Sequence, residues 1–230
     1  MPQLHKITFP GESNNYRSKR NELLEAELKL RTDIEHVASL RRSLPNGGKL
    51  KKDYIFQLTR AGWADSKEIH FSELFQNGKQ SLFVYSFMYH PDQEKPCTSC
   101  TSILDGLNGQ ARHISDRVNF VVIAKAPIDK LRAWAESREW KNLILLSSYN
   151  NSFNTDYQSE SPEGNQWPLA HVFKQEEDTI YHFYTSELLY TATEEGQNSR
   201  HVDMMWPLWN IFDLTPEGRG TNWYPKHSYI

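Results

Sequence analysis

The stretch SFMYHPDQEKPCTSCTSILDGLNG (Ser86–Gly109) holds the two cysteines of the chain, Cys97 and Cys100, three positions apart. An apolar run, SLFVYSFMY at residues 81–89, precedes them, and TSILDGLNGQARHIS at residues 101–115 follows with helical spacing. The near-continuous apolar run predicts a strand that is buried on both faces, as in a central parallel sheet. The two thiols are therefore expected at a junction between a buried strand and a helix.

The same alternation continues after the cysteines. Two more apolar runs, NFVVIA (119–124) and LILLSS (143–148), predict buried strands. PIDKLRAWAESREW (127–140) lies between them and predicts a helix that begins near Pro127. An order of strand, helix, strand, helix, strand favours parallel strands joined by right-handed connections.

The remainder of the main domain has a different character. The polar stretch SYNNSFNTDYQSESPEGNQW (148–167) predicts a long surface loop. PLAHVFKQEEDTIYHFYTS (168–186) predicts an antiparallel hairpin with its turn at QEED. Residues 200–220 are expected to begin as a helix and to end in turns, as a C-terminal extension.

An amphipathic helix is expected over residues 12–44, and the sequence PNGG at residues 45–48 ends it. Its apolar positions fall near helical spacing: Leu23, Leu30, Ile34, Val37 and Leu40. The helix either packs on its own domain or forms a homodimer with a second copy. We therefore expect an N-terminal helical arm at residues 1–48 and the main domain at residues 49–230.

Composition narrows the class of protein. The chain has 230 residues, a net charge of −3 and a pI near 6.3, so a nucleic-acid partner, which requires a concentrated basic face, is not expected. No apolar run reaches the roughly 20 residues that span a membrane, and the N-terminus lacks the apolar region of a secretory signal. We therefore expect a cytoplasmic protein without a membrane partner, in which a C-x-x-C pair is more often redox-active or metal-binding than structural.

The order of these elements resembles the thioredoxin fold. A buried strand, a C-x-x-C that opens a helix, further β and α elements, and Pro168 directly before a hairpin all have counterparts there. The resemblance implies an α/β fold with a central mixed sheet flanked by helices. It also implies that Pro168 faces the cysteines, at the position where thioredoxins carry a cis-proline. The sequence leaves open whether Pro168 is cis, since most X–Pro bonds are trans.

A nearer resemblance is to an uncharacterised bacterial family of thioredoxin-like proteins, catalogued as a domain of unknown function. It rests on blocks such as CTSCTSILDGLNG, SSYNNSFNTD, HVFKQEEDTIYHFYT and DLTPEGRG, and it extends over approximately residues 23–220. The family implies a fold but no substrate. The pair is Cys-Thr-Ser-Cys, where thioredoxin has Cys-Gly-Pro-Cys, so the partners of thioredoxin do not transfer to this chain.

Peroxiredoxins are a related possibility that the sequence argues against. Their reactive cysteine follows the pattern Pro-x-x-x-Thr-x-x-Cys. Here Glu94 stands three residues before Cys97 and His90 stands seven before it. Peroxidase activity by that mechanism is therefore not expected.

The position of the two thiols predicts their roles. A free cysteine is mostly protonated at neutral pH, but the N-terminus of a helix supplies unpaired N–H groups and partial positive charge that favour the thiolate. Cys97 is therefore the expected nucleophile, and Cys100, one helical turn later, is the expected resolving thiol. Thr98 and Ser99 either donate hydrogen bonds near the thiolate or serve only as ordinary residues of a helix start.

Other residues near the pair have alternative interpretations. His90 and the charged residues beside it either tune the thiol pKa or form a solvated loop. Pro168 lacks an N–H and would leave neighbouring backbone free for an extended substrate. Asp105 is either helix surface or a proton relay, and Trp206 and Trp209 either cover an apolar face or form an aromatic lid over the thiols.

A zinc site is the rival to redox chemistry, and it would need histidines to complete four ligands. The available histidines match no zinc spacing: His90, His171, His182 and His201. Neither a metal nor another cofactor is expected. We expect a cytoplasmic thiol–disulfide oxidoreductase that acts on a disulfide-bearing protein or small molecule and is recharged by a separate reductase. The alternative is a thioredoxin-fold module that binds a protein or small ligand in a cleft beside SSYNNSF (residues 147–153), without redox turnover.

Overall fold

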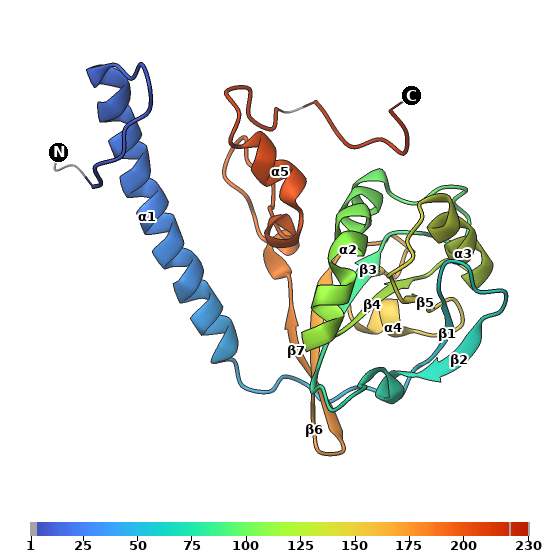
Figure 1. Ribbon diagram of the computed structural model, residues 1–230. Coiled ribbons are helices and arrows are strands. Elements are labelled where there is room, and N and C mark those ends of the chain that lie inside the picture. The colour runs from blue at the N-terminus through green and yellow to red at the C-terminus, as the bar shows by residue number, and fades with distance from the viewer. Residues whose placement is uncertain (1–3, 221, 230) are drawn as a thin grey trace. The chain divides into compact units, whose positions relative to one another are not determined.

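One mixed sheet of seven strands organises the residues that a computed structural model describes, namely 4–220 and 222–229. The order across the sheet is β2-β1-β5-β4-β3-β6-β7 (Figure 1). The strands are β1 (Ile55–Thr59), β2 (Lys67–His70), β3 (Ser81–Phe87), β4 (Asn119–Ala124), β5 (Leu145–Ser147), β6 (Ala170–Glu176) and β7 (Thr179–Thr185).

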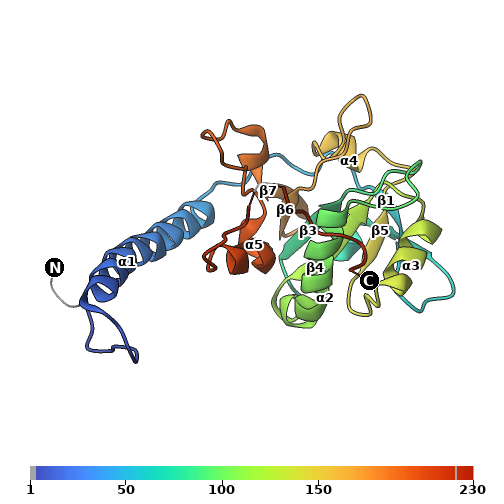
Figure 2. The same ribbon diagram turned by 90° about the horizontal axis from the view of Figure 1, so that it is seen from above.

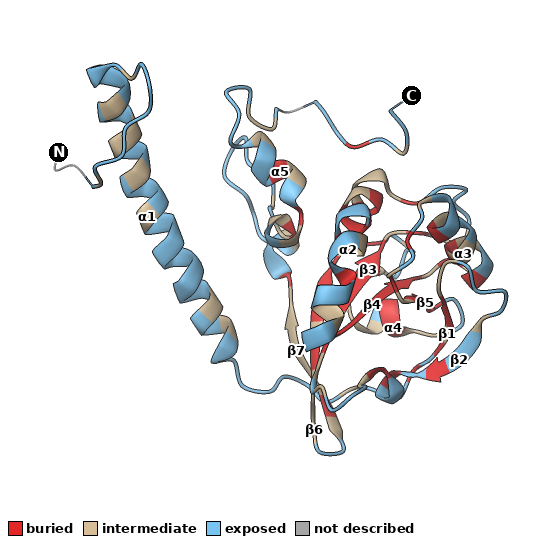
Figure 3. Ribbon diagram, viewed as in Figure 1, coloured by how far each residue is buried: buried red, intermediate tan, exposed pale blue. Residues whose placement is uncertain are grey.

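The centre of the sheet is parallel and its edges are antiparallel. Strand β4 runs parallel to both β3 and β5, with Phe83 opposite Phe120 and Val122 opposite Leu145. Strands β1 and β2 form one antiparallel edge, and the hairpin β6–β7 forms the other. Strands β3 and β4 are buried along most of their length (Figure 3). The predicted α/β fold with a mixed sheet flanked by helices is therefore confirmed.

Helices cover both faces of the sheet. In Figure 2, helices α2 (Thr98–Arg117) and α3 (Ile128–Ser137) lie on one side of the strands, and the short α4 (Phe153–Asp156) lies on the other. The core beneath α2 and α3 contains Tyr85, Phe87 and Trp140, and the core on the opposite face contains Val84 and Phe153. Alternation along β3 divides its side chains between the two cores, because successive residues of a strand point to opposite faces.

The stretch expected as a surface loop, residues 148–167, is anchored more firmly than its polarity suggests. Phe153 is completely buried and packs against the rings of Phe56 and Phe71. Ser148 Oγ donates to Asn154 Oδ1 at 2.6 Å, which satisfies a buried amide oxygen. One aromatic anchor within a polar run has no periodicity to reveal it, so the sequence pattern missed this element.

The chain divides into two compact units, and the first of them ends at Pro45. It contains helix α1 (Asn14–Arg42), which is capped by Ser13. Ser13 Oγ accepts from Tyr16 N–H at 3.1 Å, and no residue of α1 is buried. The predicted helix is thus confirmed, and its role in packing or in a homodimer remains a prediction. Among the described residues, no helix has the length and apolar character needed to span a membrane.

The chain continues beyond β7 with short helices and turns. These are the 3-10 helices η2 (Glu187–Tyr190) and η3 (Asp203–Met205) and the helix α5 (Pro207–Phe212); a further 3-10 turn, η1 (Phe71–Leu74), follows β2. Residues 198–224 are called the C-terminal segment below. The helix that was expected from residue 200 onward begins as a 3-10 turn and becomes α5 at Pro207, which occupies the first helical turn.

Candidate active site

The loop between β3 and α2 places Cys97 at the carboxyl end of a central parallel strand. Cys97 N–H donates to Met88 O at 3.0 Å, which closes the loop just after β3. The Tyr89 hydroxyl donates to Glu94 O at 2.9 Å and Lys130 Nζ donates to Gln93 O at 3.1 Å, so side chains also hold the loop. Open α/β sheets commonly bind ligands at this edge.

Cys97 is the N-cap residue of α2. Its sulfur accepts from Cys100 N–H at 3.5 Å, and both cysteines are free thiols. A hydrogen bond from the Cys100 thiol is the largest cause that lowers the pKa of Cys97 to about 6; burial opposes it, and backbone N–H groups of Cys100 and Ser99 add to it. The half-buried Cys97 is therefore largely a thiolate at neutral pH.

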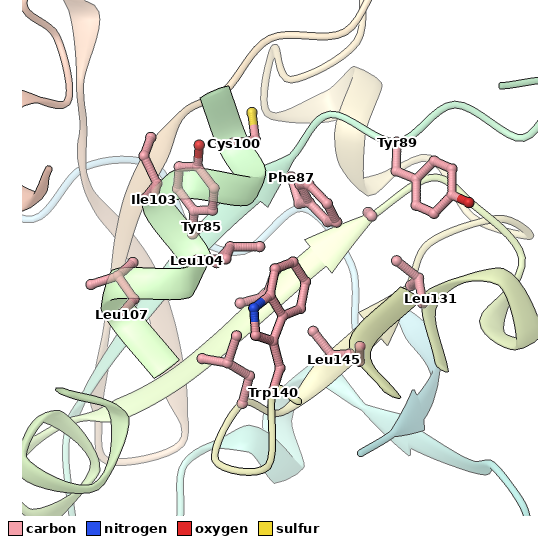
Figure 4. Close-up of a cluster of buried hydrophobic side chains, with 14 of the residues drawn as sticks. Tyr85, Phe87, Tyr89, Cys100, Ile103, Leu104, Leu107, Leu131, Trp140 and Leu145 are labelled. Atoms are coloured by element: carbon pink, nitrogen blue, oxygen red, sulfur yellow. The ribbon is translucent and has the colours of Figure 1, made fainter. Parts of the chain in front are cut away.

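Cys100 is the complementary partner. It is 1% exposed, and burial, reinforced by the adjacent Cys97, raises its pKa well above the usual range. The fully buried Tyr85 hydroxyl lies at the same end of the core as the Cys100 sulfur (Figure 4). Burial also raises the pKa of Tyr85, so this hydroxyl remains a donor. The pair thus combines one ionised, half-buried sulfur with one protonated, buried sulfur.

Cys97 lies between two cavities. A cavity of about 220 Å³ is lined by Cys97, Cys100, Tyr85 and Pro168 together with the C-terminal segment, and is called the aromatic cavity below. A second cavity of about 550 Å³, lined by Cys97, His90 and the segment 163–167, lies on the other side. A substrate can therefore approach the reactive sulfur from either side.

The C-terminal segment is tied to the elements that carry the thiols. Trp206 Nε1 donates to Ser102 Oγ of α2 at 3.2 Å, and His201 Nε2 donates to Pro168 O at 3.1 Å. Both Trp206 and Trp209 line the aromatic cavity. Both are also buried in the core that contains Tyr85 and Cys100, so they cover an apolar face, as expected, and that face borders the thiols.

Some of the other expected site residues lie beside the thiols, and others do not. Pro168 shares the aromatic cavity with both thiols, and the peptide bond that precedes it is trans, unlike the cis-proline of thioredoxin. Ser99 acts on Cys97 through its backbone N–H. Thr98 lines neither cavity, and among the described contacts its hydroxyl makes no hydrogen bond to Cys97.

The hydrogen bonds of His90 are made within its own loop and not with the thiols. Its backbone N–H donates to Gln93 Oε1 at 3.2 Å, and its Nδ1 accepts from Asp92 N–H at 3.2 Å. His90 lines the larger cavity with Cys97, without a hydrogen bond between them in the described part of the chain. Across residues 4–220 and 222–229, no three His, Cys, Asp or Glu side chains gather as metal ligands do.

Asp105 joins helix α2 to the segment that directly follows α3. Its Oδ1 accepts from Trp140 Nε1 at 2.8 Å and from Arg138 Nε at 3.2 Å. Trp140 is 1% exposed, so Asp105 is the partner of a buried donor. The proton-relay interpretation of Asp105 has no support in these contacts.

Asp105→Ala is therefore expected to destabilise the protein by about 1–3 kcal/mol, because the buried indole N–H loses its acceptor. Urea unfolding followed by tryptophan fluorescence measures the change. Asp129→Ala is the matched control, since Asp129 pairs with Arg132 at the surface and its loss should change stability little. Equal effects of the two substitutions would show that Asp105 contributes no more than a surface ion pair.

Two groups beside the thiols escaped the sequence analysis. Tyr85 lies within the apolar run at residues 81–89, which predicts only a buried strand and contains no sign that this side chain lines the aromatic cavity. Arg219 lies 119 residues beyond Cys100 in the sequence, yet it lines the same cavity. Its only local signal is a lone arginine within the turn sequence TPEGRG (residues 215–220).

Comparisons with known proteins support the fold. A family model described as "Bacterial protein of unknown function (DUF899)" matches residues 5–229. No curated protein sequence matches the chain. The crystal structure of the Plasmodium falciparum antioxidant protein (1-Cys peroxiredoxin) is 12% identical, covers 73% of this chain and 99% of its own, and has a TM-score of 0.52. Because the identity is low, this likeness shows a shared thioredoxin-like fold and nothing further.

Two other solved structures are similar at lower scores. Plasmodium vivax 2-Cys peroxiredoxin in its reduced form is 14% identical, with coverage of 71% of this chain and 94% of its own and a TM-score of 0.48. Enterococcus faecalis AhpC is 14% identical, with coverage of 72% and 92% and a TM-score of 0.46.

Proposed function

The chain belongs to the bacterial family of unknown function DUF899, and from its site geometry we propose that it is a thiol–disulfide oxidoreductase. The observation that carries the proposal is the unequal pair at the start of α2. Cys97 is half-buried with a pKa of about 6, and Cys100 is buried and protonated one turn later. A nucleophilic thiolate beside a protected second thiol is the arrangement that two-step disulfide exchange requires.

Each residue has a definite part in the proposed reaction. The Cys97 thiolate attacks a substrate disulfide and forms a mixed disulfide, and Cys100 then attacks Cys97 and releases the second half of the substrate. Pro168 and Ser99 shape the site beside the sulfur, and the larger cavity with His90 gives access to it. The substrate is a disulfide on a protein or a small molecule, and a separate thiol reductant restores the pair. We place this activity in the cytoplasm, where a reducing environment keeps such a pair available as thiols.

Alkylation of the reduced protein tests the proposal. With iodoacetamide, the rate is expected to rise with pH to a midpoint near 6 as Cys97 ionises, far below the roughly 8.5 of an unstructured cysteine. Peptide mapping should place the label on Cys97, because Cys100 is buried and stays protonated. Cys97→Ser supplies the control and should abolish the fast labelling. A midpoint near 8.5 would contradict the proposed activation of Cys97.

A second candidate function is ligand binding without redox turnover. It is favoured by a cavity of about 340 Å³ lined by Ser147, Asn150 and Asn151 together with residues of β1, beside the stretch SSYNNSF. This cavity contains neither cysteine. The alkylation experiment separates the two functions, since a binding module has no need of a thiol that reacts faster than one in a simple peptide.

A further inference from the structure

The aromatic cavity differs in size and lining from the larger cavity on the other side of Cys97. It is small, at about 220 Å³, and it reaches both sulfur atoms. Its remaining walls are mainly apolar and aromatic: Ile103, Trp206, Trp209 and Trp223. The tryptophan rings meet edge to face, with centroids 5.4 Å apart for Trp206 and Trp209 and 5.8 Å apart for Trp209 and Trp223. Such walls accept a flat apolar group.

One buried donor in this cavity has no partner. Nη1 of Arg219, from the C-terminal segment, is buried without a hydrogen bond, whereas Nη2 donates to Asp203 at 2.9 Å and Nε donates to Asp213 at 2.8 Å. The buried Tyr85 hydroxyl, from β3, interacts with the Cys100 thiol, which adds to the rise that burial causes in the pKa of Tyr85. Buried polar groups are nearly always paired, so the unpaired Arg219 donor indicates a missing acceptor.

The charges around Arg219 specify what kind of acceptor fits. Arg219 Nη1 is a donor, so the missing group is an acceptor. The nearby His201 is satisfied, with Nδ1 accepting from Ser199 Oγ at 2.9 Å and Nε2 donating to a backbone carbonyl. Asp203 and Asp213 pair with both Arg200 and Arg219, so the charges already balance. A neutral acceptor therefore fits better than an anion.

We propose that the aromatic cavity binds low-molecular-weight disulfides, each half of which is a flat apolar ring with a neutral hydrogen-bond acceptor. Arg219 Nη1 donates to the acceptor on the ring, and the Tyr85 hydroxyl, next to the sulfurs, donates to the thiolate that leaves. This inference rests on the proposed function and specifies its substrate. A space of about 220 Å³ admits a small ring and not a folded protein, so approach through this cavity, unlike approach from the larger cavity beside His90, selects small substrates.

The proposed reaction transfers two electrons from the cysteine pair to the bound disulfide. The Cys97 thiolate attacks one sulfur of RS–SR, the S–S bond breaks, and RS⁻ leaves with the electron pair while Cys97–S–S–R forms. The Cys100 thiol then passes its proton to the departed thiolate and attacks the Cys97 sulfur, which releases the second RS⁻. The substrate gains two electrons and the cysteine pair becomes a disulfide, which a dithiol reductant reduces again.

Single-turnover kinetics of the fully reduced protein test this substrate class. Dipyridyl disulfide has a neutral ring nitrogen on each half, and oxidised glutathione is larger and charged. Each rate is divided by the rate at which a free cysteine peptide reacts with the same disulfide. This removes the difference in intrinsic reactivity between the two disulfides. We expect the normalised rate to be at least about tenfold higher for dipyridyl disulfide, since its flat ring fits the aromatic walls and its ring nitrogen accepts from Arg219 Nη1, whereas oxidised glutathione is larger and charged. Equal normalised rates would overturn the proposal.

Matched variants separate the two donors. Tyr85→Phe should lower the saturated rate with dipyridyl disulfide on the order of tenfold, because the leaving thiolate loses its hydrogen-bond donor. Arg219→Lys should instead raise the half-saturating concentration, since Arg219 contacts the ring and not the sulfur. Tyr54→Phe, which removes a buried hydroxyl on the opposite face of the sheet, should change neither quantity. Unchanged kinetics in Tyr85→Phe would contradict the role of Tyr85.

A binding measurement distinguishes failure of this inference from failure of the proposed function. The variant Cys97→Ser with Cys100→Ser cannot react, and dipyridyl disulfide bound between the tryptophans should quench their fluorescence in a saturable way. Quenching in this variant supports the cavity as a binding site even if the wild type shows no turnover. Turnover of both disulfides without saturable quenching would refute the cavity and leave the oxidoreductase proposal standing.

Discussion

Cys97→Ser is expected to lower the rate of disulfide reduction by at least about a thousandfold, because a serine hydroxyl does not ionise near neutral pH and cannot replace a thiolate nucleophile. Wild-type Cys97 has a pKa of about 6, so most of it is reactive at pH 7. Turnover with a small disulfide and an excess of dithiol measures the change. A variant that retains turnover would exclude Cys97 as the nucleophile.

Cys100→Ser is the matched comparison, because it should fail at a different step. The first half of the substrate should still leave at close to the wild-type rate, in an amount equal to the protein. The second half should then remain on Cys97 as a mixed disulfide, which intact-mass measurement detects. Because Cys100 also contributes the hydrogen bond that lowers the Cys97 pKa, the alkylation midpoint should move above 6 in Cys100→Ala, which removes the donor, and less in Cys100→Ser, whose hydroxyl can still donate. Continued turnover would assign resolution to another thiol or reductant.

The second large effect concerns acid stability and comes from His171. This side chain is completely buried between strands, where Nε2 lies 3.1 Å from Ser159 Oγ and 3.2 Å from Ser86 Oγ, and Nδ1 lies 2.7 Å from Thr185 Oγ1. Burial, with a smaller contribution from His182, lowers the pKa of His171 to about 3. The folded protein thus keeps this ring neutral at a pH where the unfolded chain binds a proton.

The sign of the effect follows from this difference. The unfolded histidine has a pKa near 6.5, so the stabilising contribution is complete above that pH and is lost as the pH falls toward 3. At about 1.36 kcal/mol per pH unit, the loss is on the order of 5 kcal/mol over this interval. Urea unfolding at a series of pH values between 4 and 7 measures the slope.

His171→Gln isolates this contribution from the carboxylates that also titrate in acid. Glutamine can hydrogen-bond to the surrounding hydroxyl groups but binds no proton. The slope of the unfolding free energy against pH should therefore decrease, between pH 4 and 6, by up to the amount that corresponds to one bound proton. His113→Gln on the exposed face of α2 should leave the slope nearly unchanged. Identical slopes in wild type and His171→Gln would show that His171 is not kept neutral by burial.

Local patterns account for the parts of the fold that were predicted correctly. Strands β3, β4 and β5 are apolar runs buried on both faces, and α2 and α3 between them have helical periodicity. The hairpin β6–β7 and its turn also follow from alternation and a polar break. These elements depend on residues within one strand or one helical turn, so the sequence displays them directly.

The elements that were missed depend on distant partners. Phe153 anchors α4 by filling a space among rings from β1 and η1, and nothing within residues 148–167 reveals that space.

The sequence alone determined that two thiols stand three residues apart at the start of a helix, after a buried strand, because strand burial, helix capping and the C-x-x-C spacing are all local properties. Only the tertiary structure decided what surrounds those thiols. The hydroxyl of Tyr85 and the guanidinium of Arg219 reach one cavity from segments 134 residues apart. Their meeting depends on the packing of the C-terminal segment against α2, which is a long-range contact that no local pattern encodes.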